Sequence, residues 1–216
     1  GERACEDEYR ALADAREAAM RAQLWNSDIG AYDDYDFVEG ALKGNTTAAA
    51  LYPLFFGLAS DAEAAATARM VEATLLAPGG LLTTSRATGE QWDAPNGWAP
   101  LHWIAVEGLA RYGHRRLAEL IAKRWLETVT RTWCETGRLV EKYDVTAPRP
   151  GGGGEYPTQD GFGWTNGVTL ALMERYQQYL PYGEVTRHAA DCAGIVAVAG
   201  RQAAAHEAGA GTEILE

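Results

Sequence analysis

Apolar residues recur at helical spacing in several parts of the chain, and this periodicity is the main signal for its secondary structure. The clearest run steps by four residues through Leu117, Ile121, Trp125, Val129 and Trp133. A four-residue step places side chains along one face of a helix. We therefore expect an amphipathic helix here that ends at Gly137, because glycine commonly occupies the position just beyond a helix C-terminus.

Weaker periodicity predicts three helices before this one. Residues 3–24 carry most of their charges on one face, which indicates a long amphipathic helix. A short helix is expected over residues 46–58, bent or shortened by a proline and a glycine within it. Another is expected over residues 62–76, capped by Asp61 and stopped by the glycines that follow Pro78.

Two further helices are predicted beside the loops richest in aromatic residues. Asn96 follows a proline and is expected to cap a helix whose apolar stripe runs from Trp98 to Tyr112, with Gly113 as its stop. The last helix is expected from residue 163 or 164 to Tyr179. Helix pairs joined by long loops, without βαβ alternation, are typical of an all-α toroid that carries its chemistry on the loops at one end.

Composition and charge exclude several classes of protein. The 216 residues are 47% hydrophobic and 10% aromatic, which is typical of globular chains. A net charge of −11, without a basic stripe, argues against nucleic acid as a partner. The sequence contains no run of 18 or more apolar residues, so it predicts no membrane-spanning helix. Widely spaced cysteines and histidines outside ligand spacing predict neither a disulfide framework nor a metal site.

The loop at residues 91–100 suits a sugar ligand. It places Gln91, Trp92 and Asn96 around a Pro-Gly corner, followed by Trp98. Flat aromatic faces cover the apolar C–H faces of a pyranose, and amides fix the orientation of its hydroxyl groups. Trp98 also continues the apolar stripe of the helix that follows, so packing in the core is at least as good an interpretation for that residue.

Two later blocks extend the pattern. Residues 141–144 read Glu-Lys-Tyr-Asp, and residues 151–167 combine four glycines with Glu155 and an aromatic-rich segment. These blocks, in this order and spacing, resemble the C-terminal part of the bacterial glycoside hydrolase family 37 trehalases. The resemblance covers roughly residues 5–180.

That resemblance implies an (α/α)6 barrel that hydrolyses α,α-trehalose to two glucose molecules with inversion, without a metal or another cofactor. It makes Glu141 the general base and Glu155 a carboxylate that contacts substrate. The other expected substrate-binding residues are Gln91, Trp92, Asn96, Tyr156, Phe162 and Trp164. A purely structural interpretation stays open for each of them. A glutamate at the end of a segment is often simply solvated, and aromatic residues often only fill a core.

Whole family members are much longer, so the resemblance implies that the chain is a C-terminal fragment. Residues 1–182 are then part of the catalytic barrel, lacking the segment with the general acid, and residues 183–216 are an Ala-rich tail without an assigned role. Such a fragment is expected to need the N-terminal part of the same barrel for activity, and to leave apolar stripes such as the one at Leu117 partly uncovered.

Two other functions stay open at this point. One is a non-catalytic sugar-binding remnant, and the other is an (α/α)6 α-glucosidase that acts on a different disaccharide. The resemblance allows either the bacterial periplasm or the cytoplasm as the compartment.

Overall fold

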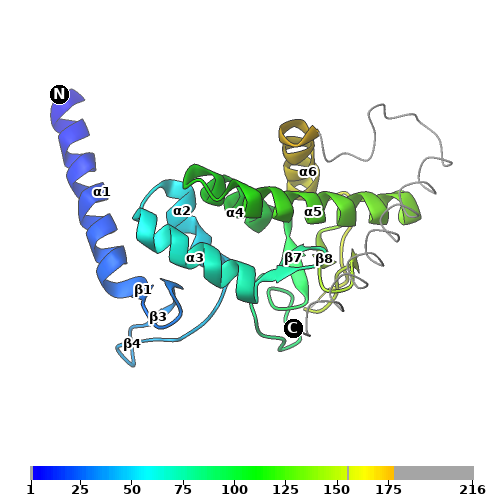
Figure 1. Cartoon of the computed structure of the whole chain (residues 1–216), viewed down its shortest axis with the longest axis horizontal. Coiled ribbons are helices and arrows are strands. Elements are labelled where there is room, and N and C mark those ends of the chain that lie inside the picture. Colours follow the sequence, from blue (N-terminus) through cyan, green and yellow to red (C-terminus); the bar gives the residue numbers. More distant parts are fainter. Residues whose placement is uncertain (1, 155, 178–216) are drawn as a thin grey trace, which may run out of the picture.

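The computed structural model describes residues 2–154 and 156–177, and this part of the chain is mostly helical (Figure 1). Its helices are α1 (Glu2–Leu24), α2 (Tyr52–Phe56), α3 (Asp61–Thr74), α4 (Ala99–Arg111), α5 (Arg115–Thr136) and α6 (Gly163–Arg175), with a 3₁₀ turn, η1 (Ala48–Leu51), before α2. Within the described ranges, no helix combines the length and apolar character that a membrane span requires. The predicted tail at residues 183–216 lies outside these ranges.

Short antiparallel ladders join the helices where the sequence predicted only loops. Three are two-stranded hairpins, formed by β1 (Trp25–Asn26) with β2 (Ala31–Tyr32), β3 (Tyr35–Asp36) with β4 (Ala41–Leu42), and β5 (Leu76–Ala77) with β6 (Gly80–Leu81). The fourth is a three-stranded sheet in the order β7 (Asn96–Trp98), β8 (Lys142–Asp144) and β9 (Arg149–Pro150). This sheet joins the two motif-bearing loops.

The helix predictions are confirmed in position, and some caps differ. Gly137 ends α5 in the left-handed conformation, with φ 69°, as expected. Asp61 was expected to cap α3, but Ser60 does so, because its hydroxyl accepts the backbone N–H of Glu63 while the Glu63 carboxylate accepts the backbone N–H of Ser60. The last helix ends at Arg175 rather than at Tyr179.

Asn96 is not a helix cap, contrary to the sequence prediction. It lies in β7, and Trp98 is the N-cap of α4 with Pro100 in the first turn. Proline is favourable there, because the first helical N–H groups have no partner within the helix. The polar side chain of Asn96 is therefore available for contacts outside the helix.

Helix α4 is the centre of the core and packs against α2, α5 and α6. The expectation of partly uncovered apolar stripes was wrong for most of their residues, although Trp133 at the end of the α5 stripe is 52% exposed. Leu117, Ile121 and Trp125 on α5 are buried, as are Trp98 and Leu101 at the start of α4. Local partners explain this, since α2, α6 and the β7–β9 sheet cover the apolar faces of the α4–α5 pair.

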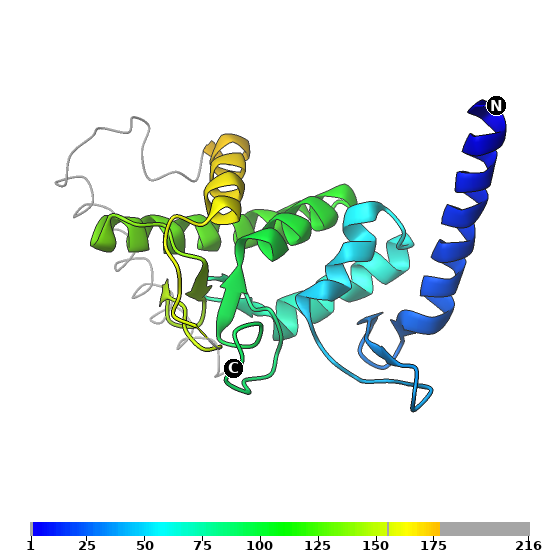
Figure 2. The ribbon, with the colours of Figure 1, turned by 180° about the vertical axis from the view of Figure 1, so that it is seen from behind.

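Helix α1 projects at one end of the molecule, apart from the other helices (Figures 1 and 2). Its base is attached to α3 through Glu63, whose carboxylate accepts hydrogen bonds from Arg21 and from the Tyr32 hydroxyl, with Nε–Oε1 and Oη–Oε2 distances of 3.2 Å each. Tyr9 and Leu12, further along α1, are exposed. Attachment therefore depends on the last turns of α1.

His102 links three segments of the core. Its Nε2 accepts the backbone N–H of Leu81 at 2.8 Å, so its Nδ1 carries the proton that is donated to the Trp98 carbonyl, also at 2.8 Å. The ring lies against Trp125 with a centroid distance of 3.9 Å. Burial lowers the pKa of His102 from 6.5 to about 3, so the ring is neutral at neutral pH.

We predict that His102 makes the fold less stable as the pH falls. Below about pH 6.5 the unfolded chain binds a proton that the folded chain refuses until about pH 3, so the free energy of unfolding falls through this window. The slope approaches about 1.4 kcal/mol per pH unit. Urea unfolding at pH 7, 6 and 5 measures it. His102→Gln keeps a donor and an acceptor without titrating, so it should remove this slope; parallel losses in both proteins would contradict the prediction.

Candidate active site

The β7–β8–β9 sheet brings the two motif-bearing loops together. Trp98 pairs with Lys142, and Asn96 pairs with Asp144. Glu141 directly precedes β8 and donates its backbone N–H to the Gln159 carbonyl at 2.8 Å. The segment before it is held by α6, since the Thr165 hydroxyl donates to the Val140 carbonyl at 2.9 Å. Glu141 is thus fixed by the sheet, α6 and the loop before α6.

The Glu141 side chain is enclosed and hydrogen-bonded at both oxygens. Glu141 is 1% exposed. Its Oε1 accepts the Tyr156 hydroxyl at 2.9 Å, and its Oε2 accepts the Lys142 ammonium at 3.0 Å. Ionised carboxylates accept hydrogen bonds through about two lone-pair sites per oxygen. The group is therefore oriented by two donors and keeps capacity for a further donor, such as water or a sugar hydroxyl.

Lys142 is a site residue to which sequence reasoning gave no role. Its side chain is 0% exposed, and its ammonium lies 5.5 Å from the ring centre of Trp98 and 5.2 Å from that of Tyr156. A lysine is rarely buried completely unless it is paired. The signal in the sequence was its place between Glu141 and the strand residue Tyr143, inside the block that carried the resemblance.

A cluster of aromatic rings lies beside the Glu141–Lys142 pair. Trp92 stacks on Trp98 with a centroid distance of 3.9 Å and an interplanar angle of 3°. Trp164 meets both rings edge-on, and Phe162 lies 4.7 Å from Trp164. Trp98 is 1% exposed and serves the core, whereas Trp92 is 43% exposed. The accessible faces of this cluster belong to Trp92 and Trp164 rather than to Trp98.

Gln91 and Asn96 brace the loops of this site. The Gln91 carbonyl accepts the Trp98 indole N–H at 3.0 Å and the Asn96 amide at 3.1 Å. The same Asn96 amide donates to the Gly152 carbonyl at 2.7 Å. The Gln91 side-chain oxygen lies 3.5 Å from the Lys142 ammonium. Asn96 is buried, so its visible role is to tie the glycine-rich run to the tryptophan loop.

The glycine run has a packing role that the sequence did not reveal. A Cβ added to Gly151 would lie 2.6 Å from Asn96 Oδ1, and one added to Gly154 would lie 2.8 Å from the Gln91 Cβ. Real Cβ atoms do not approach this closely, so the run must be glycine where it crosses the tryptophan loop. Glu155 follows directly but lies outside the described residues.

The acidic residues near the site have structural partners. Asp93 accepts hydrogen bonds from Thr88 and Thr84, and those from Thr88 lower its pKa most. Asp93 thereby braces the Pro-Gly corner that directly follows it. Burial acts to raise the pKa of Asp144, but hydrogen bonds from Thr146, Ala147 and Arg149 outweigh it and lower that pKa. In the described ranges, no three His, Cys, Asp or Glu side chains are grouped as metal ligands.

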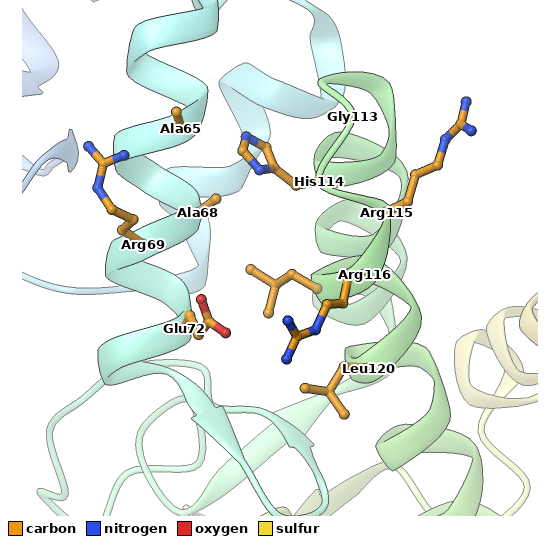
Figure 3. Close-up of a pocket in the computed structure, with 10 residues that line it drawn as sticks. Ala65, Ala68, Arg69, Glu72, Gly113, His114, Arg115, Arg116 and Leu120 are labelled. Atoms are coloured by element: carbon orange, nitrogen blue, oxygen red, sulfur yellow. The ribbon is translucent and has the colours of Figure 1, made fainter.

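One pocket on the surface is remote from these residues. A pocket of about 350 Å³ lies between α3 and the start of α5, lined by Arg69 and Glu72 on one side and by His114 and Arg116 on the other (Figure 3). It is at the N-terminal end of α5, whereas Glu141 follows the C-terminal end of that helix. The pocket therefore does not belong to the Glu141 site.

Comparisons with known proteins identify the family and the fold class. The trehalase family model matches residues 1–177. The periplasmic trehalase of Xanthomonas campestris pv. campestris (strain 8004) is 56% identical over 174 residues, which cover 80% of this chain and 30% of that protein. Neutral trehalase Nth1 from Saccharomyces cerevisiae superposes with a TM-score of 0.68 at 27% identity, covering 88% of this chain and 32% of the other.

A second solved structure extends the likeness. The GH63 mannosylglycerate hydrolase from Thermus thermophilus in complex with glucose matches with a TM-score of 0.59 at 25% identity, covering 74% of this chain and 38% of the other. These neighbours confirm the predicted fold class, the (α/α)6 toroid of glycoside hydrolases. Within that class, the chain belongs to the trehalase family. It spans about 30% of the length of the curated relatives it matches.

We predict that Asn96→Ala loosens the glycine run. The variant loses hydrogen bonds to the Gln91 and Gly152 carbonyls, each worth about 0.5–1.5 kcal/mol, so the free energy of unfolding should fall by about 1–3 kcal/mol. Limited proteolysis should also cut residues 151–154 faster. Asn45→Ala, the same change in another loop, is the control. Unchanged cleavage in Asn96→Ala would show that this amide does not hold the run.

Proposed function

We propose that this chain forms the base-bearing part of an inverting α,α-trehalase, an enzyme that hydrolyses trehalose to two glucose molecules. The observation that carries the proposal is the Glu141 carboxylate, 1% exposed and held by a donor on each oxygen beside an aromatic cluster. The family of the chain supports trehalose as the substrate. The relatives named periplasmic trehalase support it as well, and they favour the periplasm as the compartment.

In this mechanism Glu141 is the general base. Inversion requires one carboxylate to take a proton from water while the water oxygen attacks the anomeric carbon, and one acid to protonate the departing glycosidic oxygen. The free lone-pair sites of Glu141 suit the first task. We assign the second task to a residue in the remainder of the barrel, since this chain matches only about 30% of its relatives' length.

The proposed sugar contacts come from both loops. Trp92, Tyr156 and Trp164 present partly exposed rings, which suit the C–H faces of glucose. Phe162 supports Trp164 from the side. Gln91 and Asn96 act by holding the loops that carry these rings, and Glu155 is proposed to accept hydrogen bonds from sugar hydroxyls.

The decisive test uses a chimera in which the upstream part of the Xanthomonas campestris relative precedes this chain. We expect the chimera to release glucose from trehalose and to act poorly on maltose, kojibiose and mannosylglycerate. Preference for one of the other substrates would indicate a different (α/α)6 hydrolase. Saturable sugar binding without turnover, at a properly folded site, would indicate a non-catalytic sugar-binding protein.

Within this chimera, Glu141→Gln and Glu155→Gln should change kcat and KM in different ways. Glu141→Gln removes the proton acceptor but keeps the shape, so kcat should fall by about 10²- to 10⁴-fold with KM little changed. Glu155→Gln loses charge-assisted hydrogen bonds worth roughly 1.5–3 kcal/mol, so KM should rise, kcat should fall, or both. Steady-state kinetics measure the split. A Glu141→Gln enzyme with unchanged kcat would contradict the assignment of the base.

The 216-residue chain alone is predicted to have no measurable trehalase activity. Loss of leaving-group protonation costs a factor of about 10² to 10⁴, and transition-state contacts made by the rest of the barrel are lost as well. A coupled glucose assay on highly purified chain measures this. Turnover that disappears in Glu141→Ala would show that the chain already holds a complete site.

A further inference from the structure

A fully buried lysine beside the proposed base has no role in the mechanism described so far. Lys142 is 0% exposed, and the Glu141 side chain that it contacts is 2% exposed. Moving an ammonium and a carboxylate out of water costs several kcal/mol per ion, and well-packed apolar residues often replace such pairs at no loss of stability. Stability alone therefore gives a weak reason for placing a lysine here.

The contacts of Lys142 point to one task. Its ammonium donates to Glu141 Oε2 at 3.0 Å and lies 3.5 Å from Gln91 Oε1. The rings of Trp98 and Tyr156 face it at 5.5 Å and 5.2 Å, distances at which an aromatic ring attracts a cation. The Lys142 ammonium is therefore held on several sides. Among the described residues, the carboxylate that contacts it is that of Glu141.

The backbone makes this contact between sequence neighbours possible. Successive side chains of a regular strand point to opposite faces of the sheet. Glu141 lies just before β8, where its N–H bonds to the Gln159 carbonyl and Val140 forms an isolated bridge with Asp160. The chain thus leaves regular strand geometry at Glu141, and the two side chains meet at 3.0 Å.

We propose that Lys142 is a positioning residue for the base: its ammonium is the countercharge of the enclosed Glu141 carboxylate and fixes Oε2, while Tyr156 fixes Oε1. Without the ammonium, the enclosed carboxylate would lose its countercharge and the donor that orients Oε2. This inference rests on the proposed function of Glu141 for its catalytic meaning. The countercharge itself is a property of the chain and is measurable without any activity.

The first experiment observes the Glu141 carboxylate in the 216-residue chain at a fixed neutral pH. Glutamate is labelled with ¹³C at the side-chain carboxyl, and the NMR signal of Glu141 is assigned by its absence in Glu141→Gln. Lys142→Met should displace this signal, because the carboxylate loses a charged hydrogen-bond donor. Lys142→Arg should keep the signal near its wild-type position. Within the described ranges, Tyr156 is the other side chain that donates to this carboxylate, so Tyr156→Phe is measured in parallel to separate its contribution.

The matched control is Lys123→Met on α5. Lys123 pairs with Glu127 at 3.8 Å across one turn, away from Glu141, and half-exposed pairs of this kind contribute little. This variant should leave the Glu141 signal unchanged. A Lys142→Met signal that coincides with the wild-type and control positions would overturn the inference. Melting curves of all variants verify folding, and Lys142→Gln, which also removes the charge, carries the comparison if Lys142→Met does not fold.

The second experiment measures kinetics in the chimera. Lys142→Met should lower kcat by about 10- to 10³-fold with KM changed little. Lys142→Arg should restore much of kcat. A Lys142→Met enzyme with wild-type kcat overturns the role. If the unsubstituted chimera does not hydrolyse trehalose, the proposed function fails, while the NMR measurement still decides whether Lys142 is the countercharge of Glu141.

Discussion

The antiparallel pairing of β7 with β8 is the constraint on which the rest of the site depends. It joins segments that are far apart in the sequence and places Trp98 directly opposite Lys142. Helix α4 begins immediately after β7, and Glu141 immediately precedes β8, so the pairing couples the core helix to the proposed base. A shift of one residue in this register would turn the side chains of β8 to the opposite face and separate the ammonium from its aromatic neighbours.

The site holds two charged side chains, Glu141 and Lys142, away from solvent, and neighbouring hydrogen bonds and aromatic rings compensate for their burial. The carboxylate of Glu141, the ammonium of Lys142 and the hydroxyl of Tyr156 form a chain of hydrogen bonds among aromatic rings. In a setting of low polarity such bonds are strong, and an unpaired member is costly. His102, by contrast, is kept neutral by burial in the core. Both of its ring nitrogens are hydrogen-bonded to the backbone.

Much of the fold could be predicted from the sequence, because long helices leave a repeating apolar signal. The four-residue step of α5 and the glycine after it identified that helix and its end. The ladders of two or three residues could not be predicted, since so short a strand shows no alternation. That is why Asn96 was expected to cap a helix but lies in β7, where a local preference gave way to a long-range pairing.

The candidate site shows the same division. Glu141 and the aromatic residues were predicted from sequence blocks, and the structure places these blocks next to one another. Lys142 was overlooked because nothing in the sequence indicates that a lysine is fully buried. The glycines at residues 151–154 were overlooked as packing residues, because glycine is required there only by the close crossing of the tryptophan loop. Chain crossings of this kind depend on tertiary contacts.

The most direct test of the central claim, that Glu141 is the base that activates water, is rescue by azide in the chimera. In Glu141→Ala, azide enters the vacated space, its nitrogen bonds to the anomeric carbon, and the glycosidic oxygen leaves with a proton from the general acid. We predict that trehalose then gives glucose and β-glucosyl azide, identified by NMR, and that Glu155→Ala gives no such product. Azide rescue of Glu155→Ala alone would contradict the account and reverse the two roles.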